Sequence, residues 1–113
     1  MVVTFRDKKL KKIASNEAKL IAKYGKVRGK KIKLRLDDLL TATTLEDVRN
    51  LPGNYHELTQ DRKGQWACSL DGPYRLIFTP HEDPIPTDED GKYIWIEIIG
   101  VEVIEIINYH KGG

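Results

Sequence analysis

Hydrophobic and polar residues follow two different periods along the chain, and the change divides it into a helical part and a strand-rich part. Residues 2–5 form a short apolar run of the kind found in strands. In the next segment Leu10 and Ile13 lie three residues apart, which predicts a short helix over residues 7–13. The chain is therefore expected to begin with a short strand and a short helix.

A longer helix is predicted to follow, starting behind Ser15 or Asn16 as its N-cap and reaching to about residue 40. Apolar residues with helical spacing form one stripe on it, namely Leu20, Tyr24, Val27 and Leu34. Gly25 and Gly29 each cost about 1 kcal/mol relative to alanine inside a helix, so a break near them is the alternative to one continuous helix.

From residue 66 onward the pattern is that of strands. Residues 66–70 and 74–78 flank Asp71-Gly72, a strong hairpin signal because both positions tolerate positive φ. A two-residue turn would pair Cys68 with Arg75 and Trp66 with Ile77, with all four on one face. Because Pro73 cannot donate the first hydrogen bond of the ladder, a longer connection is the alternative.

The last long apolar segment, residues 93–107, is apolar on both alternating faces apart from three glutamates. This pattern predicts a central strand with a bulge or break at Gly100. Residues 79–92 are rich in Pro, Asp and Glu and are expected to form a mobile surface loop. Together the patterns predict a single α+β domain over residues 1–113, with two helices packed on one face of an antiparallel sheet.

Charge is distributed unevenly, although the net charge is only +2. Residues 1–35 carry 13 Lys or Arg and two acidic residues, a net charge of +11, whereas residues 36–113 carry 6 and 15, a net charge of −9. A polyanionic partner and a solvated helix face explain this asymmetry about equally well.

Several classes of protein are excluded by composition. Cys68 is the only cysteine, which excludes an intrachain disulfide and a cysteine-rich zinc site and leaves it as a small buried hydrophobe. No apolar stretch approaches the ~20 residues of a membrane span, and the amino terminus lacks a signal-type apolar core. We therefore expect a cytoplasmic protein without a membrane partner, and no motif predicts a metal ligand or a cofactor.

Short motifs in the carboxyl-terminal half occur in a specific order. They are Leu51-Pro-Gly, His56-Glu-Leu, Lys63-Gly-Gln-Trp66, Asp71-Gly-Pro-Tyr-Arg75-Leu-Ile-Phe, Asp83-Pro-Ile-Pro and Ile106-Ile-Asn-Tyr-His110. In this order they resemble the HigB-type killer toxins of the RelE/ParE superfamily over residues 51–110. The amino-terminal half matches only in layout, a strand followed by two basic helices. The resemblance implies a RelE-like α+β fold.

The resemblance also implies a function. Such proteins are toxins of type II toxin-antitoxin systems, ribosome-dependent mRNA endonucleases that inhibit translation and are silenced by a helix-turn-helix antitoxin of the HigA kind. The family's catalytic residues fall here on His56, Arg75, Tyr109 and His110. This chain has Asn108 where family members commonly have Asp. It also lacks the cation that many members carry shortly after the first histidine, unless Arg62 or Lys63 replaces it.

The residue types fit metal-independent RNA cleavage by acid-base catalysis. His56 and His110 are candidates for the acid and the base, because an unperturbed imidazole titrates near neutrality. Arg75 has the donor geometry to stabilise a phosphorane, unless it only pairs with an acidic side chain across the sheet. Tyr109 and Trp66 can stack on a base or shape the pocket, and for Trp66 a place in the core is as good an explanation.

The expected RNA-binding residues are Arg62, Lys63, Trp66 and Asn108. The alternative function is a non-enzymatic module on the same fold, either a ParE-like gyrase inhibitor or an antitoxin-binding protein without catalysis. Asn108 and the missing cation favour this alternative, whereas His56 and the Tyr-His tail favour the enzyme.

Overall fold

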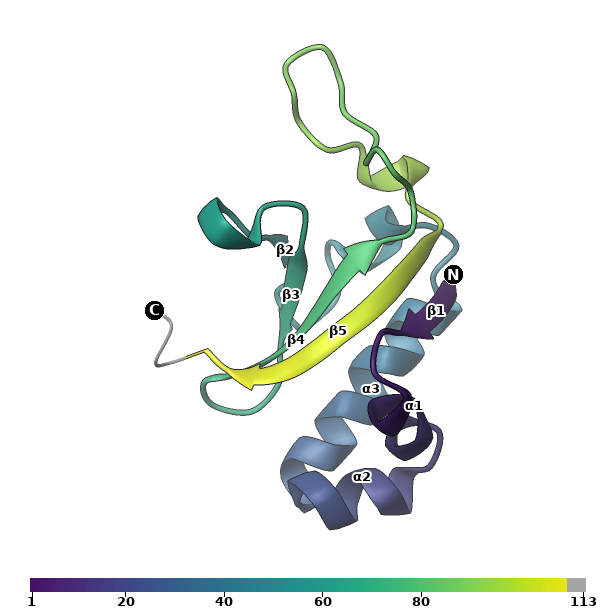
Figure 1. Cartoon of the computed structure of the whole chain (residues 1–113), viewed down its shortest axis with the longest axis vertical. Coiled ribbons are helices and arrows are strands. Elements are labelled where there is room, and N and C mark those ends of the chain that lie inside the picture. Colours follow the sequence, from purple (N-terminus) through teal and green to yellow (C-terminus); the bar gives the residue numbers. More distant parts are fainter. Residues whose placement is uncertain (110–113) are drawn as a thin grey trace.

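The computed structural model describes residues 1–109, which form helices and a mixed five-stranded sheet (Figure 1). The elements in chain order are β1 (Val2–Phe5), α1 (Lys8–Ala14), α2 (Glu17–Tyr24), α3 (Lys26–Thr41), β2 (His56–Glu57), β3 (Trp66–Ser69), β4 (Tyr74–Pro80) and β5 (Gly100–Asn108). Single 3₁₀ turns lie at Leu45–Val48, Gln60–Arg62 and Trp95–Glu97. The predicted α+β class is confirmed.

The strands are ordered β1-β5-β4-β3-β2. Three neighbouring pairs are antiparallel as predicted, but β1 runs parallel to β5, so the expectation of a purely antiparallel sheet is wrong. A parallel pair needs a long crossover, and here all the helices and three strands separate β1 from β5 in sequence. β5 lies between β1 and β4, which confirms its predicted place inside the sheet.

The helical part contains three helices rather than two. The helix predicted over residues 7–13 is α1, whose N-terminus is capped by the Asp7 carboxylate. The longer predicted helix starts behind Asn16 but breaks at Gly25, where φ is +88° and α2 gives way to α3. Gly29 lies inside α3, where a glycine is needed because the backbone of α2 passes very close to it. A Cβ atom on Gly29 would lie 2.8 Å from the backbone nitrogen of Ile21.

The break at Gly25 also changes which residues of the long segment are buried. Leu20 is fully buried as predicted, but Val27 and Leu34 are exposed, so the predicted stripe is wrong beyond α2. Because α3 starts with a new helical phase, its buried face is instead formed by Ile32, Leu36 and Leu39.

The helices pack on one face of the sheet, as predicted (Figure 1). The core that they share with it contains Leu10, Leu20, Ile32, Leu36 and Leu39 from the helices and Trp66, Cys68, Leu76, Phe78, Val101 and Val103 from the strands. Cys68 is fully buried, which confirms its expected role as a small hydrophobe. No helix within residues 1–109 is long and apolar enough to cross a membrane.

The hairpin between β3 and β4 differs from the predicted register by one residue. Ser69 lies opposite Arg75, and the N–H of Leu70 donates to the carbonyl of Tyr74, so three residues, 71–73, form the connection. The longer connection, which the missing N–H of Pro73 had suggested as the alternative, is therefore the one observed. Since a shift of one residue moves side chains to the other face, Arg75 is separated from Trp66 and Cys68.

The end of the sheet that leads into the long loop is also displaced from its predicted position. β4 continues to Pro80, so the loop starts later than expected, and it projects away from the sheet (Figure 1). β5 begins only at Gly100, because residues 95–97 form a 3₁₀ turn, which confirms the expected break. A side chain at Gly100 would collide with the His81 ring, since a Cβ would lie 2.5 Å from its Nδ1.

Candidate functional site

The face of the sheet turned away from the helices, called the open face below, brings together residues from four chain segments. His56 lies opposite Ala67, Ala67 opposite Ile77, and Ile77 opposite Glu105. Directly opposed residues project on the same face, so these four form one row. The next row is Ser69, Arg75 and Ile107, two residues further along each strand. His56 and Arg75 therefore share the open face.

The ring of His56 is held in one orientation by the chain just before it. Its Nδ1 lies 2.7 Å from the carbonyl oxygen of Asn54. Because a carbonyl only accepts hydrogen bonds, Nδ1 carries the proton, and in the neutral ring Nε2 is then the acceptor. Asn54 has φ of +48°, a left-handed conformation that asparagine tolerates better than most residues. This turn fixes the tautomer that a general base needs.

Arg75 lies beside the hairpin connection. Its Nη1 donates to the carbonyl oxygens of Gly72 and Tyr74, each at 2.9 Å. Arg75, Gly72, Pro73 and Tyr109 line a hollow of about 570 Å³. The N–H of Tyr109 donates to the carbonyl of Pro73 at 2.8 Å, which ties the end of β5 to this hairpin. Arg75 and Tyr109 thus border the same space. An ion pair of Arg75 across the sheet, the alternative to a catalytic role, is not among the interactions of residues 1–109.

Tyr109 lines a second hollow as well. It packs against the small apolar cluster of the open face, which contains Leu58, Ala67 and Ile77. The second hollow measures about 210 Å³ and is lined by Thr59, Gln60, Asp61, Arg62, Ile107, Asn108 and Tyr109. Two of the expected RNA-binding residues, Arg62 and Asn108, therefore border the same space as Tyr109.

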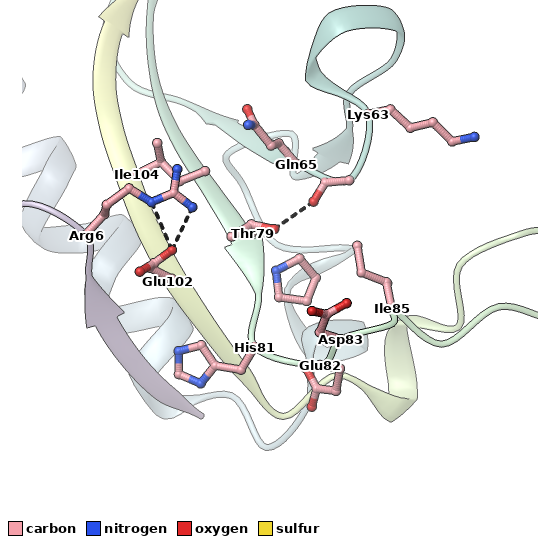
Figure 2. A pocket seen from close by; sticks show the side chains of 12 residues that line it. Arg6, Lys63, Gln65, Thr79, His81, Glu82, Asp83, Ile85, Glu102 and Ile104 are labelled. Carbon is pink, nitrogen blue, oxygen red and sulfur yellow. Dashed lines mark hydrogen bonds and ion pairs between the residues drawn. The ribbon is translucent and has the colours of Figure 1, made fainter.

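The two cations proposed as substitutes for the missing one lie in different places. Arg62 donates to a carboxylate oxygen of Glu105 and to the Gln65 side chain, both at 2.9 Å. Its charge is therefore paired on the open face. Lys63 borders a third hollow at the other end of this face, where it points away from the cavity (Figure 2).

The spacing of the open-face residues suits a ligand longer than one functional group. His56 and Arg75 are separated by two strand spacings, about 10 Å, and by a step of two residues along the strands, about 7 Å. Their side chains do not need to touch each other to contact neighbouring groups of one nucleotide chain. His110, the fourth expected catalytic residue, lies outside the described residues.

Trp66 does not contribute to the open face. Its side chain is fully buried on the helix-covered side, with its ring 5.0 Å from that of Tyr93 and 5.8 Å from that of Trp95. The prediction that Trp66 binds RNA is wrong, and its place in the core is confirmed. The reason is the hairpin register, which turns Trp66 and Arg75 to opposite faces.

The covered face also holds two titratable groups near His56, and neither ionises near neutral pH. Burial raises the pKa of the Cys68 thiol to about 12 and raises the pKa of Tyr55 well above its usual range. A buried thiol with a raised pKa is a poor nucleophile, so Cys68 is not a catalytic cysteine.

Sequence reasoning missed the third hollow, which measures about 490 Å³. On its wall, Arg6 from the segment after β1 pairs with Glu102 of β5 at 2.8 Å between Nη2 and Oε1, and Thr79 donates to the carbonyl of Gly64 (Figure 2). His81, the first residue after β4, contacts the Thr4 hydroxyl at 2.7 Å through its Nε2. Only the parallel pairing of β1 and β5 brings these segments together, and no local motif announces it.

No group of three or more His, Cys, Asp or Glu within residues 1–109 is arranged to hold a metal ion. In comparisons with known proteins, no protein-family model and no curated protein matches this chain.

Proposed function

We propose that this chain is the toxin of a type II toxin-antitoxin system, a ribosome-dependent mRNA endonuclease with a RelE-like fold. The main support is the common face of His56, Arg75 and Tyr109, which come from separate segments and occupy the family's catalytic positions in the motif order. The fixed ring of His56 adds to it, because its Nε2 is prepared to accept a proton.

In the proposed reaction, Nε2 of His56 takes the proton of a ribose 2′-hydroxyl, and the 2′-oxygen attacks the adjacent phosphorus. Arg75 stabilises the charge that develops on the phosphorane oxygens. The bond to the leaving 5′-oxygen breaks as His110 gives that oxygen a proton, which leaves a 2′,3′-cyclic phosphate and a 5′-hydroxyl end. Tyr109 supports a neighbouring base by stacking. This chemistry needs no cofactor.

Single-turnover cleavage of ribosome-bound mRNA tests the roles of these residues. His56→Gln and His110→Gln remove acid-base capacity, so each is expected to slow cleavage by about 10²–10⁴-fold with little loss of binding. Arg75→Ala should weaken both turnover and binding, because the guanidinium contacts phosphate in both states. His81→Gln is the matched control, since this histidine lies at the third hollow. Equal rates for all variants would contradict the enzymatic proposal.

A second candidate is the non-enzymatic module, which the Arg62–Glu105 pair favours. This pair places a carboxylate on the open face and occupies the cation that would otherwise meet RNA. Mapping mRNA ends in cells after brief induction distinguishes the candidates, because a gyrase inhibitor leaves mRNA intact. Asn108→Asp adds a second measurement: it should raise cleavage if a carboxylate orients a neighbouring histidine, and it should have no effect in a protein that does not cleave RNA.

A toxin of this kind needs an inhibitor, and we expect a helix-turn-helix antitoxin encoded beside it. An apolar groove of about 290 Å³ lies between β1, α1 and α3, lined by Val3, Phe5, Lys11, Ala14, Ser15, Lys33, Leu36, Asp37 and Leu40. The apolar lining suits the apolar face of an amphipathic helix, and Lys11 can meet an acidic flank of that helix, whereas Lys33 is already paired with Asp37 at 2.7 Å. Leu40 is 55% exposed there.

Co-expression with the neighbouring gene tests this partner. The antitoxin should protect growth and co-purify, and Leu40→Asp should weaken the complex because it puts an anion into the apolar lining of the groove. Val27→Asp is the matched control, since Val27 is also exposed on α3 but does not line the groove. Absence of both protection and a complex would contradict the partner proposal. Ribosome and mRNA as the other partners imply a cytoplasmic protein.

A further inference from the structure

A single charged side chain is buried within residues 1–109, that of Arg35 in the middle of α3. Its exposed fraction is 5%, and its Nε donates to the carbonyl oxygen of Ser69 at 2.8 Å. Burying a charge is costly, and an apolar side chain of similar volume would often be as stable or more so. A role beyond filling space is therefore the better explanation of an arginine at this position.

The loop that leads to His56 is packed directly onto this guanidinium. Gly53, with φ of +122°, approaches so closely that a Cβ on it would lie 2.8 Å from Nε of Arg35. The carbonyl of Gly53 accepts from the N–H of Ser69 at 2.7 Å, and the hydroxyl of Tyr55 donates to the carbonyl of Arg35 at 3.3 Å. Helix α3, this loop and the end of β3 thus meet at Arg35.

Two of the segments that meet at Arg35, loop 53–55 and the end of β3, lead directly to residues of the open face. The loop runs through Asn54, whose carbonyl fixes the ring of His56, and Ser69 lies directly opposite Arg75. We propose that Arg35 is a positioning residue of the open face, which acts from the covered side by fixing loop 53–55 and the end of β3. It thereby sets the orientation of the His56 ring and its spacing from Arg75. The catalytic consequence rests on the proposed function, whereas the orientation of the ring does not.

The tautomer of His56 provides a test that does not depend on activity. Long-range proton–nitrogen correlation spectra of the neutral ring, assigned with His56→Gln, should show Nδ1 protonated in the wild type. In Arg35→Met, which keeps length and packing but removes the donor, the ring should move toward the tautomer mixture of a free imidazole. Arg28→Met is the matched control, because Arg28 also joins α3 to the hairpin but through Asp71. It should keep the wild-type tautomer.

Folding must be verified for each variant by its circular dichroism. If Arg35→Met does not fold, Arg35→Lys serves instead, since it retains a buried cation but lacks the Nε donor and the planar group against Gly53. The same tautomer change is expected from it. A folded Arg35 variant with the wild-type tautomer overturns the proposal.

Cleavage measurements then connect the ring to catalysis. If the proposed function holds, the Arg35 variant should lose about 10²-fold in single-turnover rate, the loss typical of a misplacement of about 1 Å, with little change in RNA binding. A tautomer change without cleavage by any protein, the wild type included, would reject the enzymatic function and keep the positioning role. A tautomer change in a variant that cleaves at the wild-type rate would overturn the catalytic part of the proposal.

Discussion

The two faces of the sheet are built from alternating residues of the same strands, yet they differ in almost every property. The helix-covered face joins a continuous core that includes Trp66, Phe78 and the buried residues of all three helices. The open face has only a small cluster of buried residues, Leu58, Ala67 and Ile77, against which partly buried hydrophobic residues pack, and it also carries the charged side chains of Arg75 and Glu105. Because the covered face supplies most of the apolar burial, the open face can hold polar groups at a lower cost in stability.

The largest expected difference between the two faces is in the stability lost when one buried side chain is truncated on each. Phe78→Ala removes a fully buried ring from the continuous core, and it should lower the free energy of unfolding by about 4 kcal/mol. Ile77→Ala, one residue earlier in β4 and also fully buried, should cost about 2 kcal/mol because its small cluster can relax around the loss. Urea denaturation of both variants measures the difference, and equal losses would show that the faces contribute alike.

The packing between α2 and α3 on the covered side gives the next largest effect. Gly29→Ala should lower the free energy of unfolding by about 2 kcal/mol, although alanine is the better helix former by about 1 kcal/mol. The reason is that the new Cβ meets the backbone of Leu20 and Ile21, which cannot move aside as a flexible side chain can. Thermal or urea unfolding measures the loss.

Gly25→Ala is the control for this effect, because a Cβ at Gly25 has no heavy atom within 4 Å but the residue has a positive φ. Its cost should reflect backbone strain alone, about 1–3 kcal/mol for a residue other than glycine at φ +88° and ψ 164°. A stabilising Gly29→Ala would mean that helix propensity outweighs the contact between the helices.

Local patterns in the sequence predicted most elements of the fold, and the errors have physical causes. Helix caps and short strands depend on neighbouring residues, so Asn16 located the cap of α2 and alternation located β1, β3 and β4, whereas β2 was not predicted and residues 93–99 were wrongly included in the last strand. The face of β3 depended on one residue in the connection, and Pro73 extended the turn from two residues to three. The parallel pairing of β1 could not be predicted, since it joins segments nearly a hundred residues apart.

The residues of the candidate site also divide into those that the sequence predicted and those that it did not. The positions of His56 and Arg75 followed from motif order, and the register then places both on the open face. The Arg62–Glu105 pair and the Arg35–Ser69 hydrogen bond join residues more than thirty positions apart, and no periodic pattern contains such information. Gly53, which follows Pro52 in the loop before His56, was the one signal in the sequence from which a close backbone approach could be inferred.

Alkaline pH should lower the stability of the protein through two titratable groups that are buried on the covered face. The pKa of Cys68 rises through burial from 9.0 to about 12 in the folded chain. The stabilisation by this group is therefore complete below pH 9 and is lost as pH rises, because the unfolded chain releases the proton first. Stability should fall by at most about 1.4 kcal/mol per pH unit for this group, and Tyr55, whose pKa burial also raises, adds to the fall at higher pH.

Urea denaturation at a series of alkaline pH values measures this slope. Cys68→Ala should be less stable at neutral pH but should show a shallower decline above pH 9 than the wild type, because the titrating group is gone. Parallel slopes for the two proteins would mean that the thiol is not protected from ionisation by the fold.

Glu105→Gln makes the smallest change and tests the charge of the open face. The side chains of the Arg62–Glu105 pair are 30% and 39% exposed, so the pair contributes at most about 1 kcal/mol and its loss should hardly affect stability. RNA binding should nevertheless improve by about 3- to 10-fold, because an anion leaves the proposed RNA-binding face and Arg62 becomes available to a phosphate. The salt dependence of binding should steepen by about one counterion, as expected for one added phosphate contact.

Glu102→Gln is the control, since Glu102 forms the corresponding pair with Arg6 at the third hollow. Titration of single-stranded RNA with each protein distinguishes the two outcomes: equal gains would reflect net charge alone, whereas a larger gain for Glu105→Gln would locate the RNA beside Arg62 and Tyr109.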